Sequence, residues 1–186
     1  MKIFKSAIIL TILISCVNYA EGNNISSVNL GEVNTHDTTK IKKSKKQWKE
    51  ILNDKAYYVL IEKGTERAFT GEYWNNVNKG TYYCKGCQLA LFTSETKFKS
   101  GTGWPSFYDR VKTNVKLVSD NSFGMIRSEV ICKRCDGHLG HVFTGEGFDT
   151  PTDKRYCING TVLKFVPAKP SAQTPQGTQK DVPERK

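Results

Sequence analysis

Short apolar runs alternate with polar, turn-forming residues along most of the chain. Between residues 81 and 166 these runs are rich in β-branched and aromatic side chains. They cover residues 81–83, 89–93, 115–118, 125–131, 141–144 and 161–166, and each is bounded by Gly, Asn, Asp or Pro. This spacing is typical of an antiparallel β domain, whereas βαβ units need longer helical stretches between strands. The pattern therefore predicts a mainly β fold.

A short helical segment is expected before the strands. Ser44 is suited to cap a helix, and Trp48, Ile51 and Leu52 would then share one face. A strong apolar run follows at residues 56–61. The sequence contains no internal repeat apart from two cysteine pairs.

The N-terminal residues 1–20 predict an export signal. Two lysines precede an apolar run that is too short to span a bilayer as a mature helix. Residues 13–16 resemble a bacterial lipobox, which would place a lipid on Cys16 and tether the protein to a membrane. A simple cut after Ala20 is the alternative. Either way we expect an exported protein that is periplasmic, membrane-anchored as a lipoprotein, or secreted.

Two further segments are expected to lie outside the fold. Residues 21–47 are rich in Asn, Ser and Thr and end in a lysine run, which predicts a disordered basic linker. Residues 168–186 are rich in Pro, Gln and Thr and predict a disordered tail. The folded domain would then cover residues 48–167, which is long enough to form a core of its own.

The net charge of +10 does not indicate a nucleic-acid partner. Residues 1–47 carry +4 and residues 167–186 carry +2, so only +4 remains for residues 48–166. No dense basic stripe interleaved with aromatic residues occurs inside the expected fold. We therefore expect no nucleic-acid binding, and the lysine run is interpreted as a solvated linker that could contact anionic lipid if the protein is tethered.

Four cysteines form two Cys-x-x-Cys pairs, Cys84 with Cys87 and Cys132 with Cys135. Each pair presents two thiolates from one tight turn, and two such turns make the tetrahedral four-sulfur site that structural zinc prefers. We expect one structural Zn²⁺ per chain, joining distant parts of the sheet. Disulfides are the rival interpretation in an exported protein, and a redox-active pair is another.

Cys157 is the only cysteine that is neither paired nor in the leader. It lies in a polar run that ends in glycine, residues 155–160, which favours a functional thiol over a small buried hydrophobe. His138 and His141 lie upstream, and a histidine can donate a proton near neutral pH or help to hold a thiolate. A structural hydrogen bond or metal ligation would also explain these histidines, but four cysteines already complete a zinc site.

Several segments in one order identify a family. The chain resembles the B-type methionine sulfoxide reductases (the MsrB or SelR family), which act on the R epimer of methionine sulfoxide. The matching runs are GTERAFTGEYW at 64–74, CKGC at 84–87, LFTSETKFKSGTGWPSF at 91–107, GMIRSEVICKRCDGHLGHVF at 124–143, RYCING at 155–160 and LKFVP at 163–167. The resemblance implies an Mss4-like β-tent of two antiparallel sheets, with the zinc away from the active site.

The resemblance also implies roles for single residues. Cys157 would be the nucleophile that attacks the sulfoxide sulfur, and His141, with His138 beside it, would protonate the oxygen. Trp104 would form an apolar wall for the substrate methyl group, since an indole face is large and rigid. Phe143 is assigned to substrate binding as well, with packing as the alternative.

Two polar residues complete the expected site. Asn159 can hydrogen-bond polar groups there, and Arg155 places a positive charge near the thiolate, which would lower the pKa of Cys157. A structural salt bridge accounts for Arg155 equally well. The other two tryptophans, Trp48 and Trp74, are expected in the core.

This chain departs from the family pattern at Thr102. Many members carry a second, resolving cysteine at this position, and no spare thiol remains in the expected mature fold. We therefore expect an external thiol, from a thioredoxin-like protein or another reductant, to reduce the Cys157 sulfenic acid through a mixed disulfide. The expected substrates are oxidised proteins that contain methionine (R)-sulfoxide. The loop at residues 144–153 also departs from the pattern.

Two other functions are compatible with the cysteine pattern. A zinc-stapled β domain that only binds a partner protein would not depend on Cys157. A thiol–disulfide oxidoreductase would depend on Cys84 and Cys87 and would keep its activity after Cys157→Ser. The joint presence of RYCING, GWPSF and HLGHVF disfavours both.

Overall fold

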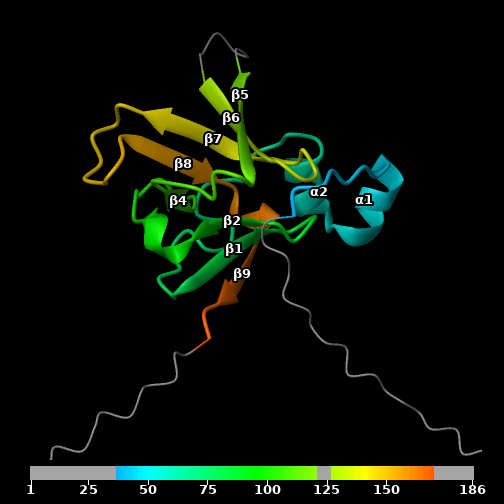
Figure 1. Cartoon of the computed structure of the whole chain (residues 1–186), viewed down its shortest axis with the longest axis horizontal. Helices are drawn as coiled ribbons and strands as arrows, with labels where there is room; N and C mark the ends of the chain where they lie inside the picture. The colour runs from blue at the N-terminus through cyan, green and yellow to red at the C-terminus, as the bar shows by residue number, and fades with distance from the viewer. Residues whose placement is uncertain (1–36, 121–126, 170–186) are drawn as a thin grey trace, which may run out of the picture. The chain divides into compact units, whose positions relative to one another are not determined.

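The computed structural model describes residues 37–120 and 127–169, and Figure 1 traces the chain. Over these residues it contains two α-helices and nine β-strands, with two short 3-10 helices at Ser94–Thr96 and Gly160–Val162. None of the helices in these two ranges has the length and apolar character needed to cross a bilayer. The predictions for the leader, Cys16 and most of the tail fall outside the described residues.

The first helix, α1 (Lys45–Ile51), begins where the sequence predicts. The Ser44 hydroxyl accepts a hydrogen bond from the Gln47 amide at 3.3 Å, and the Gln47 side chain accepts one from the Ser44 amide at 2.8 Å. Such a capping box contributes about 1 kcal/mol. Trp48 and Leu52 are buried as expected, but Ile51 is 54% exposed.

The apolar run at residues 56–61 forms most of a second helix, α2 (Asp54–Leu60). Asn53 caps it, because its side-chain oxygen accepts a hydrogen bond from the Ala56 amide at 2.9 Å. Four of its side chains are buried: Ala56, Tyr57, Val59 and Leu60. The fold therefore has two N-terminal helices where the sequence predicted one short segment.

The basic linker predicted over residues 21–47 extends too far into the fold. Helix α1 already begins at Lys45, and residues before it contact the turn around Arg134. Asp37 forms an ion pair with Arg134 at 3.1 Å, and the Ile41 amide donates to the Arg134 carbonyl at 2.9 Å. Lys40 pairs with Asp136 in the same turn. Local capping and these contacts outweigh the low apolar content of the segment.

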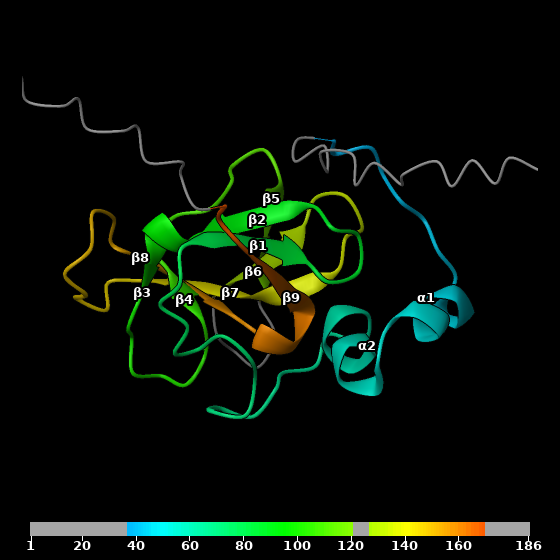
Figure 2. The same cartoon turned by 90° about the horizontal axis from the view of Figure 1, so that it is seen from below.

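The strands form two antiparallel sheets, which confirms the predicted fold class. The smaller sheet has the order β2-β1-β9, and the larger has the order β3-β4-β8-β7-β6-β5. Their bounds are β1 Gly80–Cys84, β2 Ala90–Thr93, β3 Lys97–Phe98, β4 Ser106–Phe107, β5 Val115–Asp120, β6 Arg127–Cys132, β7 His138–Thr144, β8 Lys154–Ile158 and β9 Leu163–Pro167. Figures 1 and 2 show the small sheet against one side of the large one, with both helices at one end.

Aromatic side chains fill the space between the two sheets. The Phe92 ring on β2 stacks on Phe107 of β4 with centroids 4.4 Å apart, and Tyr82 of β1 meets the same ring edge-on at 5.1 Å. Tyr156 and Ile158 of β8 are fully buried in this core. Since successive side chains of a strand point to opposite faces, Cys157 faces the other side of the large sheet.

The sequence analysis did not predict β8, which carries Cys157. Its run is polar and short of β-branched residues, so packing of Tyr156 and Ile158 rather than propensity places it in the sheet. The expectation that Trp74 lies in the core is wrong. Its side chain is 36% exposed and meets the exposed Phe69 ring edge-on at 5.3 Å.

Candidate active site and metal-binding cluster

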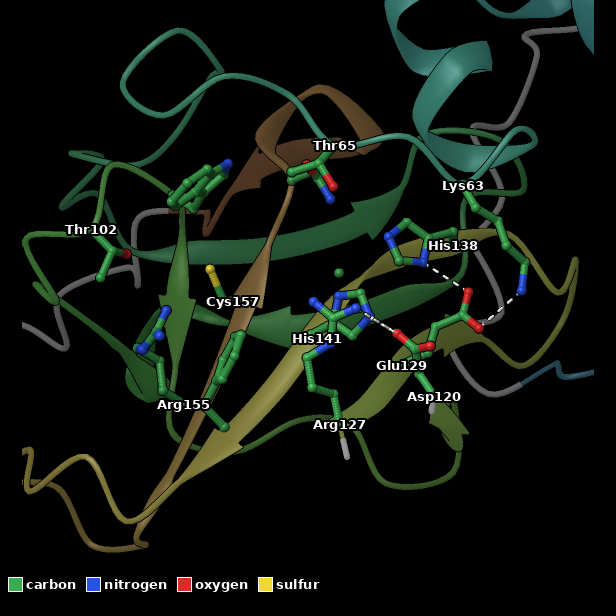
Figure 3. A pocket seen from close by; sticks show the side chains of 14 residues that line it. Lys63, Thr65, Thr102, Asp120, Arg127, Glu129, His138, His141, Arg155 and Cys157 are labelled. Carbon is green, nitrogen blue, oxygen red and sulfur yellow. Dashed lines mark hydrogen bonds and ion pairs between the residues drawn. The ribbon is translucent and has the colours of Figure 1, made fainter. Parts of the chain in front are cut away.

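A cavity of about 590 Å³ opens on the outer face of the large sheet (Figure 3). Both polar and apolar groups line it. The lining residues are Lys63, Thr65, Thr102, Trp104, Asp120, Arg127, Glu129, His138, Gly140, His141, Phe143, Arg155, Cys157 and Asn159. The structure therefore brings every predicted catalytic and substrate-binding residue to one cavity.

Strand pairing explains how distant residues meet there. Glu129 on β6 lies directly opposite His141 on β7, and His141 lies directly opposite Cys157 on β8. Residues opposite each other in an antiparallel pair share a face, with Cβ atoms about 4.5–5.5 Å apart. The three side chains therefore form one row across three neighbouring strands.

A second set of side chains lies next to this row. Arg127, Phe143 and Arg155 are each two residues away from a member of the row on the same strand. Asp120 pairs with Arg127 across β5 and β6, and Phe143 pairs with Arg155 across β7 and β8. A shift of two positions keeps a side chain on the same face of the sheet. One face of the large sheet is thus the floor of the cavity, and the other is the core.

A β-bulge places His138 on the cavity face as well. Residues three apart on a regular strand point to opposite faces, but the β6–β7 register shifts between Val130 and Ile131. Gly140 pairs with Val130 and His138 pairs with Ile131, so Leu139 is the extra residue and points into the core. The ring centroids of His138 and His141 lie 5.4 Å apart.

Gly140 permits this close packing because it has no side chain. A Cβ atom at this position would lie 2.0 Å from the Cys157 carbonyl oxygen of the next strand. The glycine between the two histidines therefore lets β7 approach the strand that carries Cys157.

The Cys157 thiol is largely buried, and burial raises its pKa above the usual value. The Arg155 charge and a hydrogen bond with Thr102 act in the opposite direction without overcoming burial. Arg155 thus lowers the thiol pKa as predicted, but the net shift is upward. At neutral pH the resting residue is a thiol, and a base must remove its proton before it becomes a nucleophile.

Thr102 ends a chain of three hydroxyl groups beside Cys157. The Ser100 hydroxyl lies 2.9 Å from that of Thr102 and 2.7 Å from that of Ser106, which is almost fully buried. Ser106 pairs directly with Cys157 across β4 and β8. Thr102 therefore belongs to a hydrogen-bonded network beside Cys157.

Arg155 is held by a bidentate ion pair. Its Nε and Nη2 atoms donate to the two carboxylate oxygens of Glu146, each at 2.7 Å. The guanidinium also lies over the Phe143 ring, 4.6 Å from its centroid. Both interpretations of Arg155 hold, since it forms a salt bridge and its charge acts on Cys157.

Each histidine is bound to one carboxylate (Figure 3). Nδ1 of His138 lies 2.8 Å from Glu129, which also accepts a hydrogen bond from Lys63 at 2.9 Å. Nε2 of His141 lies 2.8 Å from Asp120 Oδ2, and the same oxygen accepts a hydrogen bond from Arg127 at 3.0 Å. The ring nitrogen that is not bound to a carboxylate is therefore Nε2 in His138 and Nδ1 in His141.

Trp104 and Asn159 are fixed by the segment before Phe69. The Trp104 indole N–H donates to the Glu66 carbonyl at 3.1 Å, so the ring that lines the cavity has one orientation. The Asn159 side chain accepts from the Glu66 amide and donates to the Leu139 carbonyl, each at 2.9 Å. Asn159 lines the cavity, and these hydrogen bonds to backbone groups hold its side chain in the cavity wall.

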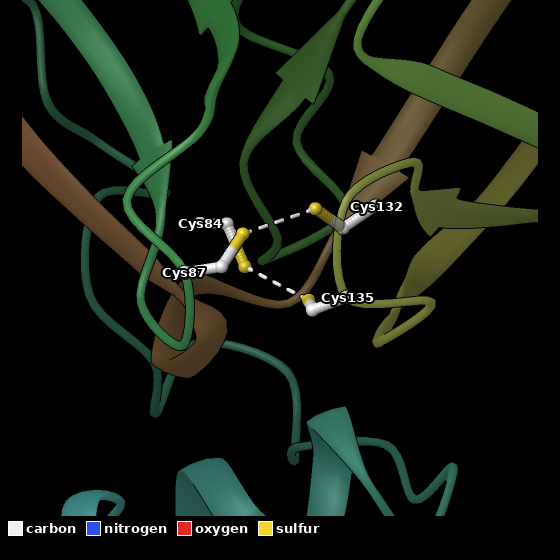
Figure 4. A group of neighbouring side chains, drawn as sticks. All are labelled: Cys84, Cys87, Cys132 and Cys135. Carbon is white, nitrogen blue, oxygen red and sulfur yellow. Dashed lines mark hydrogen bonds between the residues drawn. The ribbon is translucent and has the colours of Figure 1, made fainter. Parts of the chain in front are cut away.

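The four paired cysteines gather where strands β1 and β6 end, at Cys84 and Cys132 (Figure 4). Their sulfur atoms all lie within 4.8 Å of one another. Cys84 lies 3.7 Å from Cys135, and Cys87 lies 3.4 Å from Cys132. All four are free thiols, and these distances exceed the disulfide length of about 2.0 Å.

The cluster fits a tetrahedral metal site. Zinc–sulfur bonds of about 2.3 Å in a tetrahedron place sulfur atoms about 3.8 Å apart, close to the cross-pair distances found here. Hydrogen bonds from Cys135 and Cys84 hold the pKa of Cys132 far below its usual range. None of the four cysteines lines the cavity. The site joins the small sheet to the large sheet, as expected.

Several cavity residues escaped the sequence analysis. Three of them are charged residues in runs that indicate no chemistry by themselves: Lys63, Asp120 and Glu129. Glu146, which does not line the cavity but pairs with Arg155, was missed for the same reason. The signal that could have found Glu129 is the alternation in SEVIC, which puts Glu129 on the face opposite Val130. The others depend on tertiary contacts.

Comparison with known proteins identifies the family of this chain. The SelR domain family matches residues 52–167. A peptide methionine sulfoxide reductase MsrB from Methanosarcina mazei is 53% identical over 128 residues, which covers 68% of this chain and 90% of that protein. The corresponding protein of Leptospira interrogans is 51% identical over 126 residues, covering 67% of this chain and 95% of that protein.

A plant relative shows the same level of similarity. The chloroplastic peptide methionine sulfoxide reductase B1 of Arabidopsis thaliana is 51% identical over 123 residues, covering 66% of this chain and 60% of that protein. The matched family segment contains the four clustered cysteines, both cavity histidines and Cys157. The chain therefore belongs to the SelR domain family of B-type methionine sulfoxide reductases.

Proposed function

We propose that this chain reduces methionine (R)-sulfoxide in oxidised proteins, with Cys157 as the nucleophile. Membership of the family makes it an oxidoreductase of the peptide-methionine (R)-S-oxide reductase class. The observation that carries the residue-level proposal is the placement of Cys157. Among the described cysteines it alone lines the cavity, opposite His141 and beside the fixed Trp104 ring.

The reaction requires a nucleophile, a proton donor and a pocket for the substrate methyl group, and this cavity offers all three. The Cys157 sulfur attacks the electrophilic sulfoxide sulfur and forms a sulfur–sulfur bond. The protonated oxygen then passes from the substrate sulfur to the Cys157 sulfur, and the electron pair of the breaking sulfur–sulfur bond stays on the methionine sulfur. A histidine protonates that oxygen, and His141 is the candidate because it lies opposite Cys157 and pairs with Asp120. Methionine and a Cys157 sulfenic acid result, so the thiol is oxidised by two electrons as the sulfoxide is reduced.

The cavity wall accounts for substrate binding. Trp104 and Phe143 present aromatic rings to the substrate methyl group, and hydrogen bonds or stacking hold both in place. The cavity is open to solvent, so a methionine side chain that belongs to a polypeptide can reach it from the surface.

An external thiol completes the cycle. None of the other described cysteines lines the cavity. The sequence resemblance supports the proposal further, since Thr102 occupies the position where many members of the family carry a resolving cysteine. A thioredoxin-like protein or a small thiol would attack the sulfenic acid, release water and form a mixed disulfide with Cys157. A second thiol then frees Cys157 as a disulfide of the reductant forms.

The four-cysteine cluster is proposed to hold one Zn²⁺ for structural reasons. Cys84 and Cys87 would bind it from the small sheet, and Cys132 and Cys135 from the large one. The metal would lock the two sheets together and supply no group to the reaction, since the cluster does not line the cavity.

An exported location remains part of the proposal on the sequence pattern of residues 1–20. Fractionation of cells that produce the full chain, with mass spectrometry of its N-terminus, would show a lipid on Cys16 or a cut after Ala20. A full-length protein that stays in the cytoplasm with an intact N-terminus would contradict it.

The decisive assay uses peptides that contain each sulfoxide epimer, with dithiothreitol as reductant, and compares the protein with its Cys157→Ser variant. We expect turnover of the R epimer only, abolished in the variant. Loss of activity in the Cys84→Ser variant with normal activity in Cys157→Ser would instead support a Cys-x-x-Cys oxidoreductase. No turnover in folded, metal-loaded protein would support a partner-binding domain.

A further inference from the structure

His138 presents a buried ring nitrogen to the cavity with no partner among the described residues. Its side chain is only 3% exposed, and Nε2 makes no hydrogen bond there, while Nδ1 is bound to Glu129 at 2.8 Å. A buried polar atom without a protein partner is rare, and a bound water or a catalytic role is the usual explanation. The unpartnered nitrogen faces the cavity that contains the Cys157 thiol.

Glu129 decides which nitrogen of His138 carries a proton. It is itself 8% exposed, and its second carboxylate oxygen accepts a hydrogen bond from Lys63 at 2.9 Å. Hydrogen bonds from Lys63 and His138 outweigh the effect of burial and lower the pKa of Glu129, so the carboxylate is ionised. An ionised carboxylate is only an acceptor, which requires the proton of a neutral His138 to sit on Nδ1.

The environment also keeps His138 neutral at rest. Burial lowers its pKa and outweighs the opposing effect of Glu129. A neutral ring with its proton on Nδ1 leaves a lone pair on Nε2. Cys157 rests as a thiol, because burial raises its pKa, so the cavity holds one buried base and one buried acid.

We propose that Glu129 is a positioning residue for the reaction, which holds His138 with Nε2 free to take the thiol proton from Cys157 through a water in the cavity. This inference rests on the proposed function. As Cys157 Sγ attacks the sulfoxide sulfur, its proton passes to His138 Nε2, and the Glu129 carboxylate stabilises the imidazolium that forms. The arrangement is the same in logic as a nucleophile, histidine and acidic residue in acyl-transfer enzymes.

The proton balance then involves both histidines. His138 gains the proton of the thiol, and His141 donates one to the departing sulfoxide oxygen. The two rings lie 5.4 Å apart between centroids, close enough for one water to return the proton. The net reaction of a thiol and a sulfoxide to a sulfenic acid and a sulfide consumes no proton, which agrees with this exchange.

Other charges near His138 must be considered in any test by pH. They come from each element that contributes to the cavity. The titratable and charged groups are Lys63 after α2, Asp120 on β5, Arg127 and Glu129 on β6, His141 on β7, and Cys157 and Arg155 on β8. Of these groups, Glu129 and Lys63 are linked to the His138 ring by hydrogen bonds, which run from His138 to Glu129 and from Lys63 to Glu129. Glu129 raises the pKa of His138, and Lys63 lowers it.

Glu129→Gln and Lys63→Met are the matched variants, assayed in the full chain against the R-sulfoxide peptide from pH 5 to pH 9. Glu129→Gln keeps the shape of the side chain but removes its charge. We expect kcat to fall by about tenfold or more, up to the 10²–10⁴ that complete loss of a proton-transfer group can cost, while KM changes by less than about twofold. Metal content and thermal unfolding would show that each variant is folded.

The acid limb of the pH profile separates positioning from a structural role. Activity requires neutral His138, so it rises with pH through the pKa of this residue. Glu129 raises that pKa and Lys63 lowers it. The limb should therefore move to lower pH in Glu129→Gln and to higher pH in Lys63→Met, whose side chain is 63% exposed and whose loss leaves the fold intact.

A double variant provides the last test of the inference. If Glu129 acts through His138, Glu129→Gln causes no further loss in a His138→Gln background. Full additivity of the two losses, an unchanged kcat in Glu129→Gln, or a limb that moves the same way in both single variants would overturn the inference. If Glu129→Gln does not fold, the Lys63→Met limb alone decides. Failure of the wild-type protein to turn over would refute the proposed function instead.

Discussion

Five described cysteines occur in two surroundings that give the same side chain different chemistry. Four of them lie within 4.8 Å of one another, do not line the cavity and have mainly other thiols as partners: Cys84, Cys87, Cys132 and Cys135. Cys157 lies alone in a cavity with histidine, arginine and hydroxyl groups around it. The first arrangement suits a metal ion, and the second suits attack on an electrophile.

The comparison shows that the two kinds of thiol differ most in where they lie on their strands. The clustered cysteines lie at strand ends and in the turns that follow, where each pair can converge on one point. Cys157 lies within β8, an interior strand of the large sheet, and its neighbours Tyr156 and Ile158 are fixed in the core. A central strand position holds one side chain firmly on a face, which is what a nucleophile needs.

The largest expected effect concerns the metal cluster. Cys132→Ser removes one ligand, so the purified protein should contain less than one zinc per chain and should lose cooperative thermal unfolding. Structural zinc contributes on the order of 10 kcal/mol, comparable to the whole stability of a domain. Metal analysis and calorimetry measure both. The Cys157→Ser variant is the matched control and should keep full zinc content and an unchanged unfolding transition.

A smaller effect is expected where charge acts on Cys157. Arg155→Met removes a cation that lowers the thiol pKa and leaves Glu146, which raises it, without its partner. The pKa of Cys157 should therefore rise further above its usual value, and iodoacetamide should alkylate it several-fold more slowly at pH 8. The rate should recover at higher pH. An unchanged pH profile of alkylation would show that the Arg155 charge does not reach the thiol.

The smallest effect is expected at the hydroxyl network. Thr102→Val keeps the shape of the side chain but removes the hydroxyl that hydrogen-bonds to Cys157 and Ser100. Alkylation of Cys157 should slow in the same direction as in Arg155→Met, but by less, because a neutral hydrogen bond is weaker than one from a charged group. Ser44→Ala, which alters only the cap of α1, is the control and should leave the alkylation rate unchanged.

The fold class and the two kinds of cysteine could be predicted from the sequence. Alternating apolar residues and turn signals predicted antiparallel strands, and the paired spacing predicted the metal cluster. Strand β8 was missed because its polar run has little strand propensity and is placed by packing. Trp74 was expected in the core, but it belongs to an exposed aromatic pair.

Some features of the site required the structure. No periodicity shows that His138 and His141 share a face, because the β-bulge at Leu139 depends on pairing with β6. Asp120 and Glu129 become histidine partners only through register between strands. Burial reverses the expected direction of the Cys157 pKa, and burial is a property of the whole fold. Residue types were readable from the sequence, but their contacts were not.

A single-turnover experiment tests most directly whether Cys157 alone carries the reaction. The full, metal-loaded chain is mixed with excess methionine (R)-sulfoxide peptide without reductant, then treated with dimedone and mapped by mass spectrometry. The account predicts one methionine released per chain and a dimedone adduct on Cys157, with the four clustered cysteines unmodified. An adduct or disulfide at Cys84, Cys87, Cys132 or Cys135, with Cys157 still a thiol, would contradict it.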